Sequence, residues 1–420
     1  MRRRRRQPLA IAAVAVLAMV VLTGCSAEVV QPPPPGRLAG APPPLDVTEV
    51  YLQQRISAMT PQQKLAALVM VHVPGLDAAR IRGVIDAYGF GGVILMGDNI
   101  GGASESVAAL TAGLSSEAGL PVLTAIDQEG GIVSRLREDH APAANDLWGA
   151  APAAAKQAFA LRSALVAQAG VLINFGIVAD VTPDRSSFIR TRTLGETPQA
   201  AAERVAAAVR GERGTVLSTL KHFPGHGASP DDSHVSIPRS SIDLATWRST
   251  HALPFQAGID AGAPLVMMGH LQFGRISPLP ASLSPTWVSV LRDELGFDGV
   301  IVTDDLLMLQ RSGVAAYADP VSTAIQALAA GNDLVLFVLP GDPSTVGVNL
   351  GGLVDSLVAA LDDGRLDEPS INASLHRVLS LRRAATGLVE PYVDCGSKCW
   401  GESPRSLDPV YRIRPGLEPR

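Results

Sequence analysis

The alternation of short apolar runs with longer alanine-rich stretches constrains the fold of this chain more than any other feature. Strands buried on both faces of a parallel sheet are apolar at consecutive positions, whereas strands with one wet face alternate apolar and polar residues. Between about residue 60 and residue 385, eight runs have the consecutive pattern: Leu68 to Val73, Gly92 to Met96, Val122 to Ile126, Ile173 to Ala179, Val216 to His222, Leu265 to Met268, Val300 to Thr303 and Leu334 to Val338.

The stretches between these runs are rich in alanine and have helical character. Examples are Ala78 to Ala87, Ala153 to Ala169, Gln199 to Arg210, Pro285 to Leu295 and Val321 to Ala330. Eight strands that alternate with helices favour a single (β/α)₈ TIM barrel, an α/β fold, over a doubly wound sheet.

Polar residues follow the apolar runs, as expected if the site lies at the carboxyl ends of barrel strands. In chain order these strand-end groups are Asp127-Gln128-Glu129 with Arg135, then Asp180, Lys221-His222, His270 and Asp304-Asp305.

The N-terminus has the pattern of an export signal, with Arg2 to Arg6 followed by the uncharged apolar run Leu9 to Leu22. The following Thr23-Gly24-Cys25 completes a sequence that resembles the lipobox of bacterial lipoproteins. This resemblance implies that residues 1–24 are a lipoprotein signal peptide and that Cys25 carries the lipid. An uncleaved membrane anchor is the alternative. In both cases we expect the body at the cell membrane, on its extracytoplasmic side.

Residues 25–45 are rich in proline, which predicts an extended, semi-rigid tether. The net charge of the 420 residues is −5, but residues 1–24 hold five arginines and no acidic residue, so 30 basic and 40 acidic residues remain. An acidic body has no bulk field that attracts nucleic acid, and we expect no such partner. In an oxidising compartment, Cys395 and Cys399 favour a disulfide over two free thiols.

Four motifs resemble glycoside hydrolase family 3, in its bacterial β-N-acetylglucosaminidase (beta-hexosaminidase) branch. They are Asp127-Gln-Glu-Gly-Gly-x-Val-x-Arg135, Lys221-His-Phe-Pro-Gly-His-Gly227, Asp232-Ser-His234 and Thr303-Asp-Asp-Leu-x-Met308. The resemblance implies a catalytic barrel over residues 46–390. The tail, residues 391–420, is too short for the second α/β sandwich domain that longer relatives carry.

The resemblance implies that Asp304 is the nucleophile of a retaining glycosidase. A cap on the following helix is the alternative for Asp304 and the favoured reading for Asp305. Without a second domain the acid/base has to come from the barrel, and the resemblance assigns it to His234, with Asp232 as the carboxylate that orients the imidazole.

The resemblance also implies a set of sugar-binding residues. Arg190 competes with Arg192 for one place in this set, and His226 is read as a structural residue of its loop. A zinc site at His222, His226 and His234 is disfavoured because Pro224 breaks helical spacing there, and we expect no metal and no cofactor. The candidate substrate-binding residues from this resemblance are Asp127, Arg135, Arg192, Lys221 and His222. Asp180 and Met267 are added as candidates because they lie at other strand ends, and a structural role is the alternative for each.

The sequence therefore predicts an exo-acting, retaining β-N-acetylglucosaminidase that hydrolyses terminal β-linked N-acetylglucosamine. Its expected partners are N-acetylglucosamine-containing glycans or muropeptides from peptidoglycan, and membrane lipid through Cys25; we expect a monomer. A phosphorylase that uses phosphate as acceptor is a close alternative. A non-catalytic sugar- or solute-binding lipoprotein is the alternative from another class.

Overall fold

The computed structural model describes residues 47–386, apart from residues 116 and 118. The predicted signal peptide, the tether, the lipidation at Cys25 and the Cys395–Cys399 disulfide lie outside the described residues. Within the described part of the chain, no helix is both long enough and apolar enough to cross a membrane.

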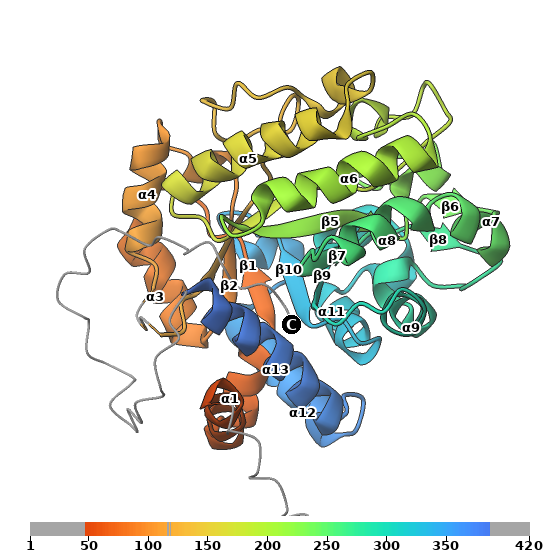
Figure 1. The fold of residues 1–420 in the computed structure, drawn as a ribbon. Helices are drawn as coiled ribbons and strands as arrows, with labels where there is room; N and C mark the ends of the chain where they lie inside the picture. The colour runs from red at the N-terminus through yellow and green to blue at the C-terminus, as the bar shows by residue number, and fades with distance from the viewer. Residues whose placement is uncertain (1–46, 116, 118, 387–420) are drawn as a thin grey trace, which may run out of the picture. The chain divides into compact units, whose positions relative to one another are not determined.

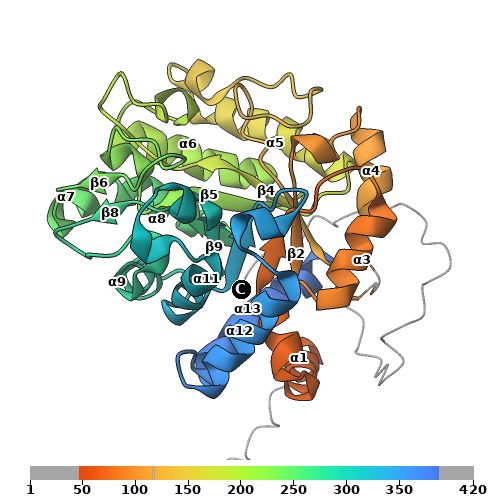
Figure 2. The same ribbon diagram turned by 180° about the vertical axis from the view of Figure 1, so that it is seen from behind.

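Eight parallel strands close into a barrel (Figure 1; Figure 2 shows it from behind). The strands follow one another around the barrel in chain order, and β10 pairs with β1 to close it, with Val69 opposite Val335. The strands are β1 (Val69–Val71), β2 (Gly92–Leu95), β3 (Leu123–Ile126), β4 (Ile173–Val178), β5 (Leu217–Phe223), β7 (Leu265–Met268), β9 (Val300–Asp305) and β10 (Leu334–Phe337). Each one falls on a run predicted from the sequence, so the predicted TIM barrel is confirmed.

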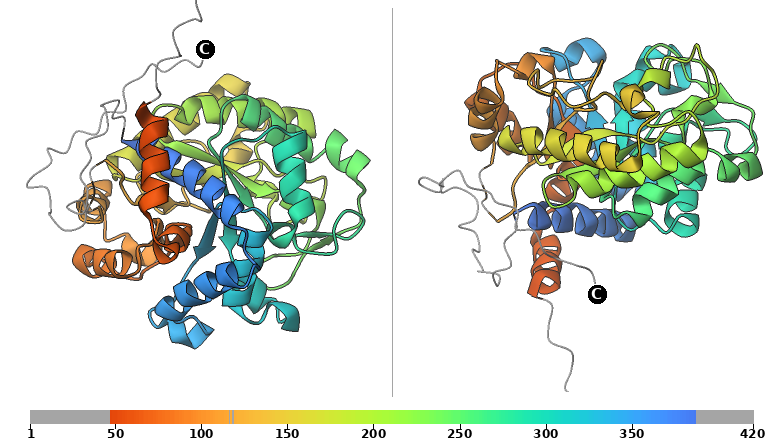
Figure 3. Two further views of the ribbon diagram at one scale, coloured as in Figure 1. Left: turned by 90° about the horizontal axis from the view of Figure 1, so that it is seen from below. Right: turned by 45° about the horizontal axis from the view of Figure 1, so that its top comes forward.

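Helices surround the barrel and connect its strands (Figures 1 and 3). Many begin at a residue whose side chain accepts a hydrogen bond from the first turn, as Asp77 does for α3 and Thr197 for α6. The helices are α1 (Val47–Ala58), α2 (Pro61–Ala66), α3 (Ala78–Tyr88), α4 (Ser104–Ala112), α5 (Pro152–Gln168), α6 (Pro198–Glu212), α7 (Leu244–Ser249), α8 (Ala252–Asp260), α9 (Pro285–Ser289), α10 (Leu307–Arg311), α11 (Pro320–Ala329), α12 (Leu350–Asp362) and α13 (Glu368–Ala385).

One predicted helix differs in detail. The stretch Pro285 to Leu295 is α-helical only as far as Ser289 and continues as a π-helical turn over Val290–Glu294. The Leu295 N–H donates to the Val290 carbonyl, which is the wider spacing of a π turn. The turn carries Arg292, whose guanidinium donates to the Phe297 carbonyl and to Asp333.

The loops at the carboxyl ends of the strands also contain structure that the apolar pattern does not predict. A small parallel sheet forms between β6 (Arg239–Ser240) and β8 (Gln272–Phe273). A 3₁₀ turn, His226–Ala228, follows β5. A Cβ atom at Gly227 would lie 2.1 Å from the Val181 carbonyl oxygen, so only glycine allows this close approach to the end of β4.

Candidate active site

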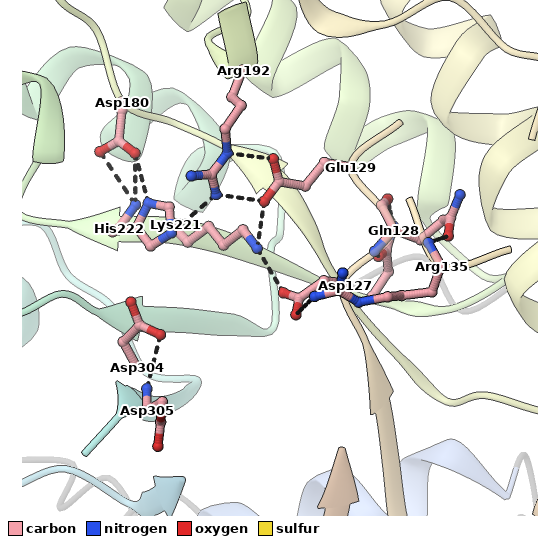
Figure 4. A network of polar contacts seen from close by, with 11 residues as sticks. Asp127, Gln128, Glu129, Arg135, Asp180, Arg192, Lys221, His222, Asp304 and Asp305 are labelled. Atoms are coloured by element: carbon pink, nitrogen blue, oxygen red, sulfur yellow. Dashed lines mark hydrogen bonds and ion pairs between the residues drawn. The ribbon is translucent and has the colours of Figure 1, made fainter. Parts of the chain in front are cut away.

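Two strand ends, those of β3 and β5, bring a lysine and two carboxylates together (Figure 4). Lys221, at the end of β5, places Nζ 2.9 Å from Asp127 Oδ1 and 2.7 Å from Glu129 Oε1. Both carboxylates directly follow β3, and Asp127 also accepts from Arg135 at 3.3 Å. Asp127 is half-buried, whereas Lys221 and Glu129 are buried. The predicted residues Asp127, Arg135 and Lys221 therefore form one cluster.

Arg192 joins the same cluster through Glu129. Its Nε and terminal nitrogen donate to the two Glu129 oxygens at 2.8 and 2.7 Å, and the same terminal nitrogen lies 3.5 Å from His222 Nε2. Arg190 instead pairs with exposed Glu196 and stacks on the Trp148 ring. Of the two competing arginines, Arg192 lies in the cluster and Arg190 lies outside it.

Asp180, at the end of β4, is fully buried and fixes the loop that follows β5. One of its carboxylate oxygens lies 2.8 Å from His222 Nδ1, and the other accepts from the His226 main-chain N–H at 2.6 Å. Because Nδ1 faces a carboxylate, His222 directs Nε2 toward Arg192. Asp180 is a positioning group for both histidines.

Asp304 is the second-last residue of β9 and lies on the side of the barrel where Lys221 and His222 lie (Figure 4). It is half-buried, and one oxygen accepts from the Asp305 N–H at 2.8 Å. Asp305 is buried and has a structural role, because it accepts from the main-chain N–H groups of Leu307 and Val338. The N-cap residue of α10 (Leu307–Arg311) is Leu306, which makes no side-chain cap hydrogen bond, so Asp305 is not the predicted cap. Asp305 instead supports the start of the helix from one position earlier and pairs with Arg311.

The basic groups keep the carboxylates of the site ionised. Burial alone would raise the pKa of Glu129, but Lys221 and Arg192 outweigh burial and lower that pKa to about 2. Burial likewise opposes the charge on Asp304, yet His222, His270 and Lys221 lower its pKa below the ordinary value. The pKa of Asp127 is also lowered, because Lys221 and Arg135 outweigh its burial. An ionised Asp304 is the state that a nucleophile requires.

His234 and Asp232 lie apart from this buried cluster. His234 Nδ1 is 2.6 Å from Asp232 Oδ1, which also accepts from the His234 N–H, so the predicted pair forms. The side chains of His234 and Asp232 are 60% and 41% exposed. Among the described residues, the hydrogen bond that connects this pair to the barrel is made by its neighbour Ser233, which bonds to His226. No described contact joins His234 to Asp304.

Two further predicted positions are buried. Met267 is 2% exposed in β7 and belongs to the apolar core, with no polar contact to the cluster among the described residues. His270 is buried between the Ser282 hydroxyl and the Asp305 carbonyl. His226 is buried as well, as expected for a structural loop residue.

The sequence pattern places Glu129 in a strand-end group but assigns it no role, whereas in the structure this carboxylate binds both Lys221 and Arg192. The available signal was its position, two residues after Asp127 in the same strand-end group. A buried carboxylate stays ionised only with charged or hydrogen-bonding partners, and Lys221 and Arg192 supply them for Glu129.

A second, fully buried layer supports the turn that carries Asp127 and Glu129. The Asn174 side chain accepts from the Gln128 N–H at 3.1 Å and donates to the Gln128 carbonyl at 3.0 Å. Its amide also donates to Glu212 at 2.6 Å. Gly130 follows with φ of +86°, a conformation that favours glycine, and it packs against Arg162.

Comparison with known proteins agrees with this site. The N-terminal domain of glycosyl hydrolase family 3 matches residues 60–381. The chain is 35% identical over 288 residues to a protein named beta-hexosaminidase from Stenotrophomonas maltophilia, covering 65% of this chain and 84% of that protein.

Solved structures give the same result. The structure of a glycoside hydrolase family 3 beta-N-acetylglucosaminidase from Paenibacillus sp. matches with a TM-score of 0.72 and 33% identity, over 81% of this chain and 65% of that longer chain. A beta-N-acetylhexosaminidase from Beutenbergia cavernae matches with a TM-score of 0.67 and 30% identity, over 77% of this chain and 98% of that chain. With its strand-end carboxylates in the place that the fold uses for catalysis, this chain belongs to glycosyl hydrolase family 3 and is a glycoside hydrolase.

Proposed function

We propose that the protein is an exo-acting, retaining β-N-acetylglucosaminidase that hydrolyses terminal β-linked N-acetylglucosamine. The names of its relatives support this activity, because the similar proteins are called beta-hexosaminidase or beta-N-acetylglucosaminidase. The similarity to the Stenotrophomonas protein covers most of that protein's length.

The placement of Asp304 carries the proposal. It lies at the carboxyl end of barrel strand β9, it is half-buried, and its pKa is lowered by nearby His222, His270 and Lys221 despite its burial. It forms no ion pair with a lysine or arginine of the described chain, whereas Asp127 and Glu129 both do. A carboxylate held ionised without a fixed cation is available to attack an anomeric carbon.

The chemistry proceeds in two steps. Asp304 attacks the anomeric carbon and forms a glycosyl–Asp304 ester, while the glycosidic C–O bond breaks and His234 transfers its proton to the departing oxygen. His234 then takes a proton from the water that hydrolyses the ester. Asp232 orients the imidazole through Nδ1 and stabilises its protonated form.

The remaining groups bind the sugar. Asp127 is half-buried and presents an ionised acceptor to hydroxyl groups, with Arg135 and Lys221 beside it. Arg192 and His222 extend the polar surface from the other side of Glu129. Charge-assisted hydrogen bonds of this kind are roughly twice as strong as neutral ones and orient the ring.

The proposed substrate source is peptidoglycan, as fragments or muropeptides. A lipid on Cys25, a tether over residues 25–45 and a catalytic body outside the cytoplasmic membrane would place a monomeric enzyme beside the wall. In the full chain expressed in bacteria, we expect Cys25→Ala to move the protein out of the membrane fraction. Retention of that variant in the membrane would contradict the lipid anchor.

The activity is tested with a chromogenic β-N-acetylglucosaminide. We expect release of N-acetylglucosamine by the wild type, loss of release in Asp304→Ala, and full release in the control Asp363→Ala, whose carboxylate is exposed far along the chain after α12. Full activity in Asp304→Ala would contradict the proposal. Sugar binding without turnover by the wild type would support the non-catalytic lipoprotein instead.

The same assay in phosphate buffer separates hydrolysis from phosphorolysis. Hydrolysis yields N-acetylglucosamine whatever the buffer, whereas a phosphorylase yields N-acetylglucosamine 1-phosphate. We expect the free sugar, and accumulation of the phosphorylated product would support the phosphorylase.

A further inference from the structure

The segment that carries Asp232 and His234 is exposed, but one buried residue within it contacts the barrel. Between the two exposed side chains lies Ser233, which is only 3% exposed. Val235, on the other side of His234, is 71% exposed. A single buried residue therefore lies in the middle of an exposed stretch.

Ser233 binds a fixed part of the barrel. Its hydroxyl lies 2.8 Å from His226 Nε2. His226 is 1% exposed, and its main-chain N–H donates to buried Asp180 at the end of β4. The connection thus runs from the exposed loop through Ser233 and His226 to a strand end.

The other hydrogen bonds of the segment are local. Among the described residues, the remaining bonds of residues 231–236 join positions within 229–236, such as the Val235 N–H to the Asp232 carbonyl and the Ser236 hydroxyl to the same carbonyl. These bonds shape the segment but do not fix it to the barrel. Of the hydrogen bonds found, the one between Ser233 and His226 does so.

An aromatic contact adds to this connection. The Phe188 ring packs edge-on against His226 at 4.8 Å between centroids and faces His234 at 6.4 Å. His226 therefore contacts both Ser233, which anchors the loop, and the Phe188 ring, which lies beside the exposed imidazole of His234.

We propose that Ser233 is a positioning residue that, through its hydrogen bond to His226, holds the Asp232–His234 pair where the imidazole reaches the glycosidic oxygen. The inference rests on the proposed function, in which His234 protonates the leaving group. An exposed side chain on a segment without this bond spends less time in the reactive arrangement, so proton transfer slows while the Asp304 nucleophile is untouched.

Leaving-group chemistry tests this inference. A 2,4-dinitrophenolate leaves as an anion and requires no proton, whereas a sugar or alkyl alcohol departs only when its oxygen is protonated. We would measure kcat/KM of the full chain for N-acetylglucosaminides with both kinds of leaving group. The variants are Ser233→Ala, Ser233→Thr, which retains the hydroxyl, and the control Ser229→Ala, a buried serine whose hydroxyl bonds lie within its own segment.

We expect Ser233→Ala to lose about tenfold or more in kcat/KM on the sugar glycoside, which is a part of the about 10²- to 10⁴-fold that general acid catalysis contributes. On the dinitrophenyl glycoside we expect a loss of less than about threefold. Ser233→Thr should recover most of the loss, and Ser229→Ala should show no dependence on the leaving group. His226→Phe, which removes the partner, should reproduce the pattern of Ser233→Ala.

Equal losses on both substrates, with or without a lower melting temperature, would overturn the inference, and so would wild-type values in Ser233→Ala. The proposed function fails in a distinguishable way. If the wild type turns over neither glycoside, the hydrolase mechanism is wrong, and the positioning role falls with it.

Discussion

The guanidinium of Arg192 and the carboxylate of Glu129, 63 positions apart in the chain, form two parallel hydrogen bonds of 2.8 and 2.7 Å. Their side chains are only 11% and 3% exposed. Glu129 also holds Lys221, so one buried carboxylate fixes two basic groups of the site. Two parallel hydrogen bonds fix the orientation of the Arg192 guanidinium as well as compensating the charge of Glu129.

The first prediction compares the two neighbouring arginines. Arg192→Met leaves Glu129 with one of its two cationic partners, and breaking a buried pair costs about 3–5 kcal/mol in unfolding free energy. We therefore expect urea unfolding to show that Arg192→Met lowers the unfolding free energy by close to this amount. We also expect kcat/KM to fall by about 10²-fold or more. The control is Arg190→Met, whose pair with exposed Glu196 contributes at most about 1 kcal/mol. Equal effects of the two variants would contradict the assignment of Arg192.

The second prediction concerns Glu212, which is fully buried and hydrogen-bonded to Asn174. Burial raises the pKa of this carboxyl from 4.5 to about 8. Between these two pKa values the folded protein keeps a proton on Glu212 that the unfolded chain has lost. The unfolding free energy therefore falls as the pH rises from about 5 to about 8, by up to ~1.4 kcal/mol per pH unit. Glu129, with its pKa lowered to about 2, changes stability only at more acidic pH.

Glu212→Gln tests this window. Glutamine keeps the oxygen that accepts from Asn174 and does not ionise, so the variant should gain stability relative to the wild type as the pH rises from 5 to 8. Thermal unfolding at a series of pH values measures the difference. A difference that stays constant across this range would show that Glu212 ionises in the folded protein as it does in the unfolded chain.

The third prediction concerns the buried Asp333, which ties α13 to the barrel. Its carboxylate accepts from Arg292 at 2.5 Å, from Arg377 at 2.7 and 2.9 Å and from Ser374 at 2.8 Å. Asp333→Ala leaves both guanidinium groups without their carboxylate, and we expect a loss of about 3–5 kcal/mol in unfolding free energy.

The control for Asp333 is Asp363→Ala. The Asp363–Arg365 pair is exposed on both sides, so its loss should change unfolding free energy by less than about 1 kcal/mol. Because Asp333 lies away from the strand-end cluster, kcat/KM of folded Asp333→Ala should equal that of the wild type. A large fall in kcat/KM with unchanged stability would argue against a structural role.

The strands and the strand-end carboxylates were predictable because their signals are local. A run such as Val300 to Thr303 is apolar over consecutive residues, and Asp304 follows it directly. The eight strands therefore appear where the apolar pattern predicts them, and the strand-end rule brings Asp127 and Lys221 together.

The rest depends on contacts between distant parts of the chain. Whether Arg190 or Arg192 enters the site is decided by a 3₁₀ turn over Arg190–Arg192, which points the two side chains to different partners. The pairing of Asn174 with Glu212 and of Ser233 with His226 likewise has no local pattern. The place of His234 near a bound glycosidic oxygen remains a prediction.

Covalent trapping identifies the nucleophile, which we propose is Asp304. A 5-fluoro N-acetylglucosaminyl fluoride reacts quickly with the enzyme to form the glycosyl–enzyme ester, and water hydrolyses this ester slowly. The intermediate therefore accumulates. After proteolysis, mass spectrometry should find one sugar on the peptide that contains Asp304, and no label in Asp304→Ala. A label on Asp127, Glu129 or another carboxylate, or turnover with inversion of the anomeric configuration, would contradict a retaining mechanism with Asp304 as nucleophile.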